Sequence, residues 1–175
     1  STSVYDNDGN VIAKDYDMLV VKSNGVVNVT DSKLTTSKLI NDGVFNVNGE
    51  STLSIGTLTG TYIRFEDAEI VGDSNIGGNI RTFGDFKVGA DLTYTQGNFY
   101  GNTTIESGAT LDGSITIVGS GAEFALADGS NLNSRFFNII GTADVAGNVV
   151  LKHSDPRQNC LQVFDGGIIN INAGA

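Results

Sequence analysis

Gly25-Val26-Val27-Asn28-Val29 and Gly43-Val44-Phe45-Asn46-Val47 are two copies of one short motif. A looser copy follows at Thr61-Tyr62-Ile63-Arg64-Phe65, and the motif returns about every 20 residues along the rest of the chain. The later copies begin at Gly84, Gly101, Gly121, Thr142 and Gly166. A constant period of this size predicts a solenoid, in which each repeat packs only against its neighbours.

The apolar clusters within each repeat are short, and they are typical of strands rather than helices. Ser51-Thr52-Leu53-Ser54-Ile55 and Gly113-Ser114-Ile115-Thr116-Ile117 alternate between polar and apolar residues, so one face of each strand is apolar. Gly, Asn and Asp separate the clusters, as at Asn41-Asp42-Gly43, and these residues accept the left-handed backbone of tight corners. Each repeat is therefore expected to form three strands and three corners.

This pattern predicts an all-β fold, a right-handed parallel β-helix of about eight three-strand coils. With coils stacked about 4.8 Å apart, the rod would be roughly 40 Å long. Residues 1–21 do not follow the repeat and are expected to form an N-terminal hairpin or cap. Residues 22–175 are expected to form the solenoid, with Val26, Val44 and Ile63 in one inward column.

Proline and glycine contents agree with stacked coils. The chain has 23 glycines but a single proline, Pro156. An interior coil uses nearly every backbone N–H in hydrogen bonds, whereas the edges and loops of a sandwich tolerate proline. The alternative fold is a β-sandwich or jelly roll with short, evenly spaced strands.

The chain is acidic, with a net charge of −10. This charge argues against binding to nucleic acids, which requires clustered Lys and Arg, and no apolar run is long enough for membrane insertion. The acidic residues are expected to form a self-repelling, solvated surface or to bind cations. Weak candidates for calcium ligands are Asp6, Asp8, Asp15 and Asp17. Val11 stands where a calcium loop has its glycine, so an antiparallel hairpin is the alternative there, and no other cofactor is expected.

The stretch from Gly101 to Ile117 resembles the coils of bacterial autotransporter passengers and related secreted β-helical adhesins. This resemblance covers most of the chain in composition, and it implies an extracellular, bacterial cell-surface location without enzymatic activity. Gly78 to Gly89 is similar to bactofilins, small β-helical proteins that polymerise end to end. Neither resemblance transfers a catalytic residue, and fold alone does not give function.

A carbohydrate-active β-helix is the alternative function, either a binding module or a polysaccharide lyase. Lys152, His153 and Arg157 form a local cationic cluster in a repeat that is longer than the others. Tyr94 and Tyr100 are further candidates, because aromatic faces stack on sugars. An ordinary exposed loop and ordinary core aromatics are the competing interpretations. Cys160, the single cysteine, has no evident group to orient it for catalysis with His153.

The C-terminal segment predicts an assembly edge. No charged residue occurs from Gly166 to Ala175, and Ile168, Ile169 and Ile171 favour a strand. An unpaired strand edge invites pairing with another chain. We therefore expect either self-association into a filament or continuation of a longer solenoid, with the protein acting as a structural or adhesive rod. A segment of a phage fibre is a further alternative.

Overall fold

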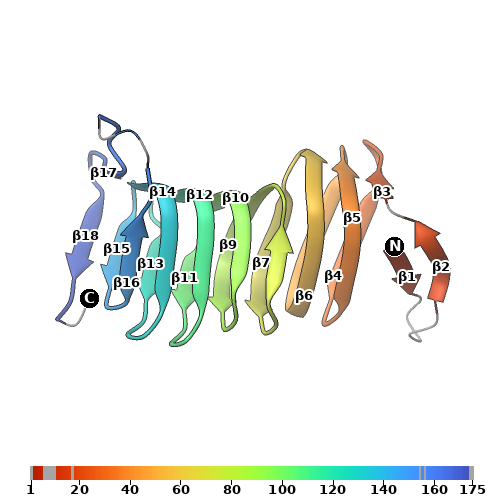
Figure 1. The fold of residues 1–175 in the computed structure, drawn as a ribbon, viewed down its shortest axis with the longest axis horizontal. Coiled ribbons are helices and arrows are strands. Elements are labelled where there is room, and N and C mark those ends of the chain that lie inside the picture. Colours follow the sequence, from red (N-terminus) through yellow and green to blue (C-terminus); the bar gives the residue numbers. More distant parts are fainter. Residues whose placement is uncertain (1, 6–10, 17, 154, 156, 174–175) are drawn as a thin grey trace.

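The computed structural model is an elongated all-β solenoid of about seven turns, without helices in the described part of the chain (Figure 1). It describes residues 2–5, 11–16, 18–153, 155 and 157–173. Strands of successive turns pair in parallel, which confirms the β-helix and excludes the sandwich. The prediction of eight coils equated each motif copy with one coil. Eight copies have seven intervals between them, and each interval is one full turn.

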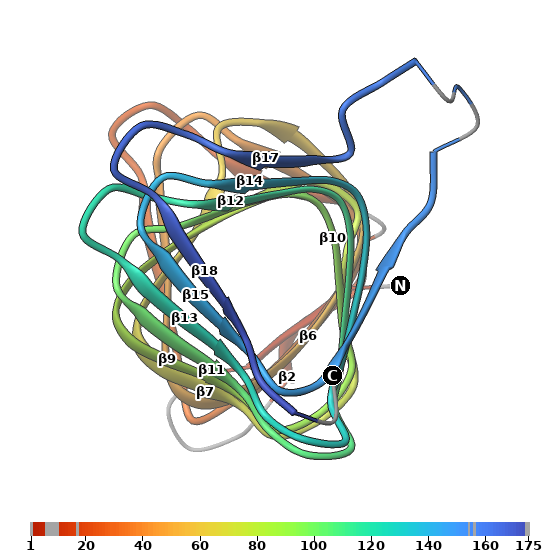
Figure 2. The same ribbon diagram turned by 90° about the vertical axis from the view of Figure 1, so that its left-hand side faces the viewer.

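Successive turns build three stacks of strands around one core, and the cross-section is roughly triangular (Figure 2). The first stack contains β4 (Val26–Thr30), β6 (Val44–Gly60), β7 (Ile63–Ile70), β9 (Asn79–Val88), β10 (Leu92–Phe99), β12 (Thr110–Val118), β14 (Asn131–Ile139) and β17 (Leu161–Val163). The second stack continues from β6, β7 and β9 through β11 (Asn102–Ile105), β13 (Glu123–Leu126), β15 (Thr142–Val145) and β18 (Ile168–Ile171). The third stack joins β5 (Lys33–Asn41), β8 (Ser74–Ile76) and β16 (Asn148–Leu151) through parts of β6, β10, β12 and β14.

The N-terminal end of the rod carries an antiparallel hairpin (Figure 1). The hairpin consists of β1 (Thr2–Tyr5) and β2 (Val11–Tyr16), as the sequence predicts. β3 (Met18–Val21) pairs in parallel with β5, so these four residues of the expected N-terminal segment already join the stacking.

Side chains of like kind pile into columns inside the rod, because the coils stack in register. One column of the first stack runs through Val47, Phe65, Thr82, Phe99, Val118 and Ile139, all fully buried. The aromatic rings of Phe65, Phe86, Phe99, Phe124 and Phe137 follow one another at centroid distances of 4.9 to 6.3 Å. Each such ring contributes about 1.5–3 kcal/mol by leaving water.

The expected column of Val26, Val44 and Ile63 is wrong. Val26 and Val44 are 60% and 46% exposed, and their neighbours Val27 and Phe45 face inward instead. Both residues of each consecutive pair are apolar, so the sequence pattern does not determine which of the two faces the core. Asn28 and Asn46 are neighbours in register on successive coils, and Asn46 Nδ2 donates to Asn28 Oδ1 at 3.1 Å.

Candidate functional site

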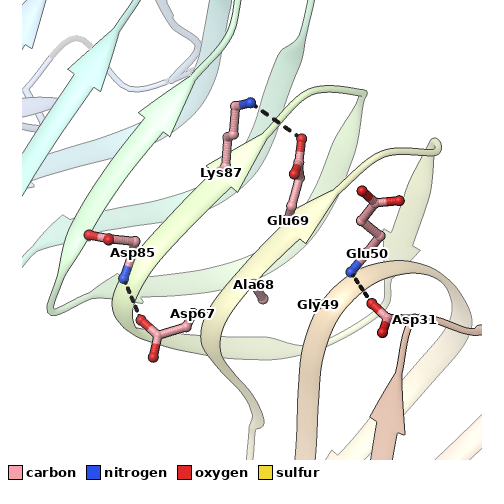
Figure 3. Close-up of a pocket in the computed structure, with 8 residues that line it drawn as sticks. All are labelled: Asp31, Gly49, Glu50, Asp67, Ala68, Glu69, Asp85 and Lys87. Atoms are coloured by element: carbon pink, nitrogen blue, oxygen red, sulfur yellow. Dashed lines mark hydrogen bonds and ion pairs between the residues drawn. The ribbon is translucent and has the colours of Figure 1, made fainter.

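An acidic groove lies at the corner between the first and second stacks (Figure 3). Its volume is about 680 Å³. The charged residues that line it are Asp31, Glu50, Asp67, Glu69, Asp85 and Lys87. They come from neighbouring coils, because the chain turns the same corner after β4 and within β6, β7 and β9.

Aspartate and glycine alternate along this corner, at Asp31, Gly49, Asp67 and Gly84, and all four have left-handed backbones with φ between 48° and 65°. Asp31 Oδ1 accepts the backbone N–H of Glu50 at 2.8 Å, and Asp67 Oδ1 accepts that of Asp85 at 3.0 Å. A side chain at Gly49 or Gly84 would collide with the carboxylate stacked on it. Asp31 and Asp67 are therefore part of the corner itself.

Lys87 supplies the positive charge of the groove. Its Nζ lies 2.9 Å from Glu106 Oε1 and 3.4 Å from Glu69 Oε1. Hydrogen bonds to these two carboxylates, chiefly Glu106, raise the pKa of Lys87 above its ordinary value. Among the described residues, no group of three or more acidic, His or Cys side chains has an arrangement suited to a metal ion. Glu69 therefore has its counter-charge within the groove.

The same capping occurs at a second corner. Asp73 Oδ1 accepts the N–H of Asp91 at 3.1 Å, and Asp91 Oδ1 accepts that of Thr110 at 2.9 Å. Each carboxylate satisfies a backbone donor of the next coil, which a charged acceptor does more strongly than a neutral one. Part of the acidic composition is therefore structural.

A different kind of surface covers the outer side of the first stack. Arg64 and Arg81 are direct neighbours in the parallel register of β7 and β9, and each reaches diagonally to a ring on the other coil. The Arg81 guanidinium lies 4.0 Å from the centre of the Tyr62 ring, and that of Arg64 lies 4.0 Å from Phe83. Phe83 stacks on Tyr100 with ring centroids 5.4 Å apart. We call these five residues the arginine–aromatic face.

The two arginines of this face differ in their partners. Arg64 Nε donates to Glu66 Oε2 at 3.2 Å. Arg81 makes no ion pair and no side-chain hydrogen bond with any described residue, and its guanidinium lies against the ring of Tyr62. On the next coil, the partly exposed Gln96 donates from Nε2 to Oδ1 of the buried Asn98 at 3.4 Å. A hollow of about 180 Å³ adjoins the face and is lined partly by Tyr62 and Arg64.

The predicted role of Tyr94 in ligand binding is wrong, because its ring is buried. Its side chain is only 3% exposed and packs over Gly113, and its hydroxyl lies 2.6 Å from Thr116 Oγ1. Burial raises the pKa of Tyr94 above its ordinary value. Tyr100, by contrast, is 43% exposed. It stacks on Phe83, a residue that was not among the sequence-based candidates.

The cationic cluster at Lys152, His153 and Arg157 lies in a loop that projects from the last turn, between β16 and β17 (Figure 2). Arg157 forms a two-pronged pair with Asp155, with both N···O distances at 3.0 Å. The His153 ring lies against Phe136 and within 3.2 Å of Arg135. Lys152 is exposed. Because Asp155 already neutralises Arg157, the cluster is a weaker anion site than its sequence predicts. The Cys160 thiol donates to the Gln158 carbonyl rather than contacting His153.

Two other sets of predicted residues lie at the ends of the chain. Asp6, Asp8 and Asp17 fall outside the described residues, and Asp15 lies in β2, where side chains are not described. Ile168, Ile169 and Ile171 lie in β18, which pairs with β15 and with no other described strand. Ile168 and Ile171 are exposed, and Ile169 packs partly against the core.

Comparisons with protein-family models, curated proteins and solved structures give no match. Among the described residues, no helix is long and apolar enough to cross a membrane.

Proposed function

We propose that this protein is a structural rod of an extracellular, bacterial cell-surface assembly, in which the last coil receives a further coil from a second copy of the chain. The location is supported by the resemblance to secreted β-helical adhesins. The shape supports a scaffold, because continuous parallel pairing and a continuous aromatic core make a stiff, elongated body.

The last coil carries the observation on which the proposal depends. Its residues continue the inward columns, yet no described residue covers them. Ile171 follows Val145 in one column and is 70% exposed, whereas Val145 is 4% exposed. Val163 follows the fully buried Ile139 and is 44% exposed. A further coil would bury both side chains and pair the open edge of β18.

Sedimentation velocity over a wide concentration range tests this association. We expect the average mass to rise with concentration and Ile171→Lys to keep the protein monomeric, because a charge at this position opposes burial. Val71→Lys is the matched control, since Val71 is a half-exposed side chain away from the last coil. A wild-type monomer at every concentration, or association by Ile171→Lys equal to wild type, would contradict the proposal. A trimer of fixed mass would support the fibre alternative instead.

A further inference from the structure

The arginine–aromatic face contains a positively charged side chain, Arg81, that has no acidic partner among the described residues. The chain has a net charge of −10, and the acidic groove occupies a neighbouring corner of the same coils. Nevertheless, Arg81 has no carboxylate partner among the described residues, and its guanidinium carbon lies 4.0 Å from the centre of the Tyr62 ring. A guanidinium held against a ring in this way loses little freedom on binding, and it retains donors in the fork that matches a carboxylate.

The neighbouring side chains provide the other contacts that a sugar chain requires. Tyr100 offers an exposed ring held by stacking on Phe83, and such a rigid ring contributes contact area at little entropic cost. The amide of the partly exposed Gln96 carries donors and an acceptor suited to hydroxyl groups. These groups lie on three successive coils about 4.8 Å apart, so they form a short row along the rod rather than one closed pocket.

Charge selects among the possible occupants of this row. A dense polyanion such as a nucleic acid would be repelled by the carboxylates of the adjacent corner. A glycan with one carboxylate per repeating unit can place that group on Arg81 and its ring faces on the aromatic side chains.

We infer that the arginine–aromatic face binds a carboxylated polysaccharide, with Arg81 holding a carboxylate and Tyr100 stacking on an adjacent sugar ring. Arg64 lies beside this contact and is partly neutralised by Glu66, so its contribution is the smaller one. The face lies along the side of the rod, so this inference does not depend on association through the last coil.

Isothermal titration calorimetry with the full chain tests the inference, with oligogalacturonate, oligomannuronate and hyaluronate fragments as probes. The Ile171→Lys background keeps end-to-end association from contributing heat. We expect at least one probe to bind, and Arg81→Gln to weaken it about tenfold or more, because a charge-assisted hydrogen bond is lost. Tyr100→Ala is expected to weaken the same probe several-fold.

Two matched controls make the result specific. Arg135→Gln removes another arginine that lies near an aromatic ring, 5.8 Å from Phe136, and should leave the affinity unchanged. Methyl-esterified oligogalacturonate keeps the sugar rings but loses the charges, and its binding should be lost or strongly reduced. Circular dichroism confirms that each variant is folded.

Three outcomes would overturn the inference. The first is that none of the three probes binds. The second is that Arg81→Gln binds as tightly as the unaltered protein, or that Arg135→Gln weakens binding equally. The third is that the neutral ester binds as well as the acid, which would show that the face stacks on sugars without recognising a carboxylate.

Discussion

The middle coils and the last coil of this rod carry the same residue pattern, but they bury it to different extents. Ile139 is fully buried and Val163, its successor in the column, is 44% exposed. The difference arises because each coil is covered by the next one, so burial depends on neighbours rather than on the residue itself. Stability should therefore fall toward the open end, and truncations within one column should measure that decrease.

The largest effect is expected from removing a buried column member. Ile139→Ala should lower the free energy of unfolding by about 2–5 kcal/mol, because it leaves a cavity in a closed core. Val163→Ala in the same column, measured in the monomeric Ile171→Lys background, should change it by no more than about 0.5 kcal/mol. Urea unfolding followed by circular dichroism measures both. Equal losses would indicate that the last coil is covered in solution.

A glycine in the middle coils gives the next largest effect. Gly113→Ala should cost about 1–3 kcal/mol, because the new methyl group would collide with the buried Tyr94 ring. Combining it with Tyr94→Leu should cost less than the sum of the two single changes, since the smaller side chain makes room. Additive losses in this double-mutant cycle would show that the ring is not the obstacle.

The corner carboxylates should give an intermediate effect. Asp67→Ala removes the acceptor for the Asp85 N–H and leaves a left-handed position to a residue that disfavours it. We expect a loss of about 1–2 kcal/mol. Asp67→Asn should recover most of it, because Asn retains an acceptor oxygen and tolerates this backbone. Asp112→Ala is the control and should be nearly neutral, because Asp112 is an exposed residue of β12 that forms no hydrogen bond or ion pair through its side chain with any described residue.

The projecting loop of the last turn should show the smallest effect, a pH dependence. The hydrogen bonds from Arg157 lower the pKa of Asp155 below its ordinary value. The pair therefore contributes fully above the ordinary aspartate pKa, and its contribution is lost as the pH falls through the lowered pKa. Carboxyl NMR titration should show this lowered pKa, and Arg157→Gln should return it toward the ordinary value. An unchanged titration in Arg157→Gln would refute the assigned cause.

The fold was predictable from sequence because its information is periodic and local. Repeated apolar clusters, tight corners and scarce proline define stacked coils without any knowledge of distant contacts. The inward-facing residues were less certain, since Val26-Val27 and Val44-Phe45 each offer two apolar residues in succession. In the structure Val27 and Phe45 face inward, because these side chains fill the space between the three stacks.

The arginine–aromatic face was not predictable in the same way. Its contacts are diagonal and join residues of different coils, and they require the register of β7 on β9. Arg64 pairs with Arg81, 17 residues further along the chain, whereas simple alignment of the repeats places Arg64 beside Lys87, 23 residues further along. The burial of Tyr94 depends in the same way on the register of β10 on β12, which places Gly113 of the next coil against the Tyr94 ring.

Aspartate and glycine alternate at Asp31, Gly49, Asp67 and Gly84, so the capping pattern of this part of the rod repeats every two coils. Duplicating a single coil here would place carboxylate on carboxylate or leave two glycines adjacent, whereas duplicating two coils would restore every cap. Growth or shortening of this segment, in evolution or by engineering, should therefore proceed most easily in units of two turns.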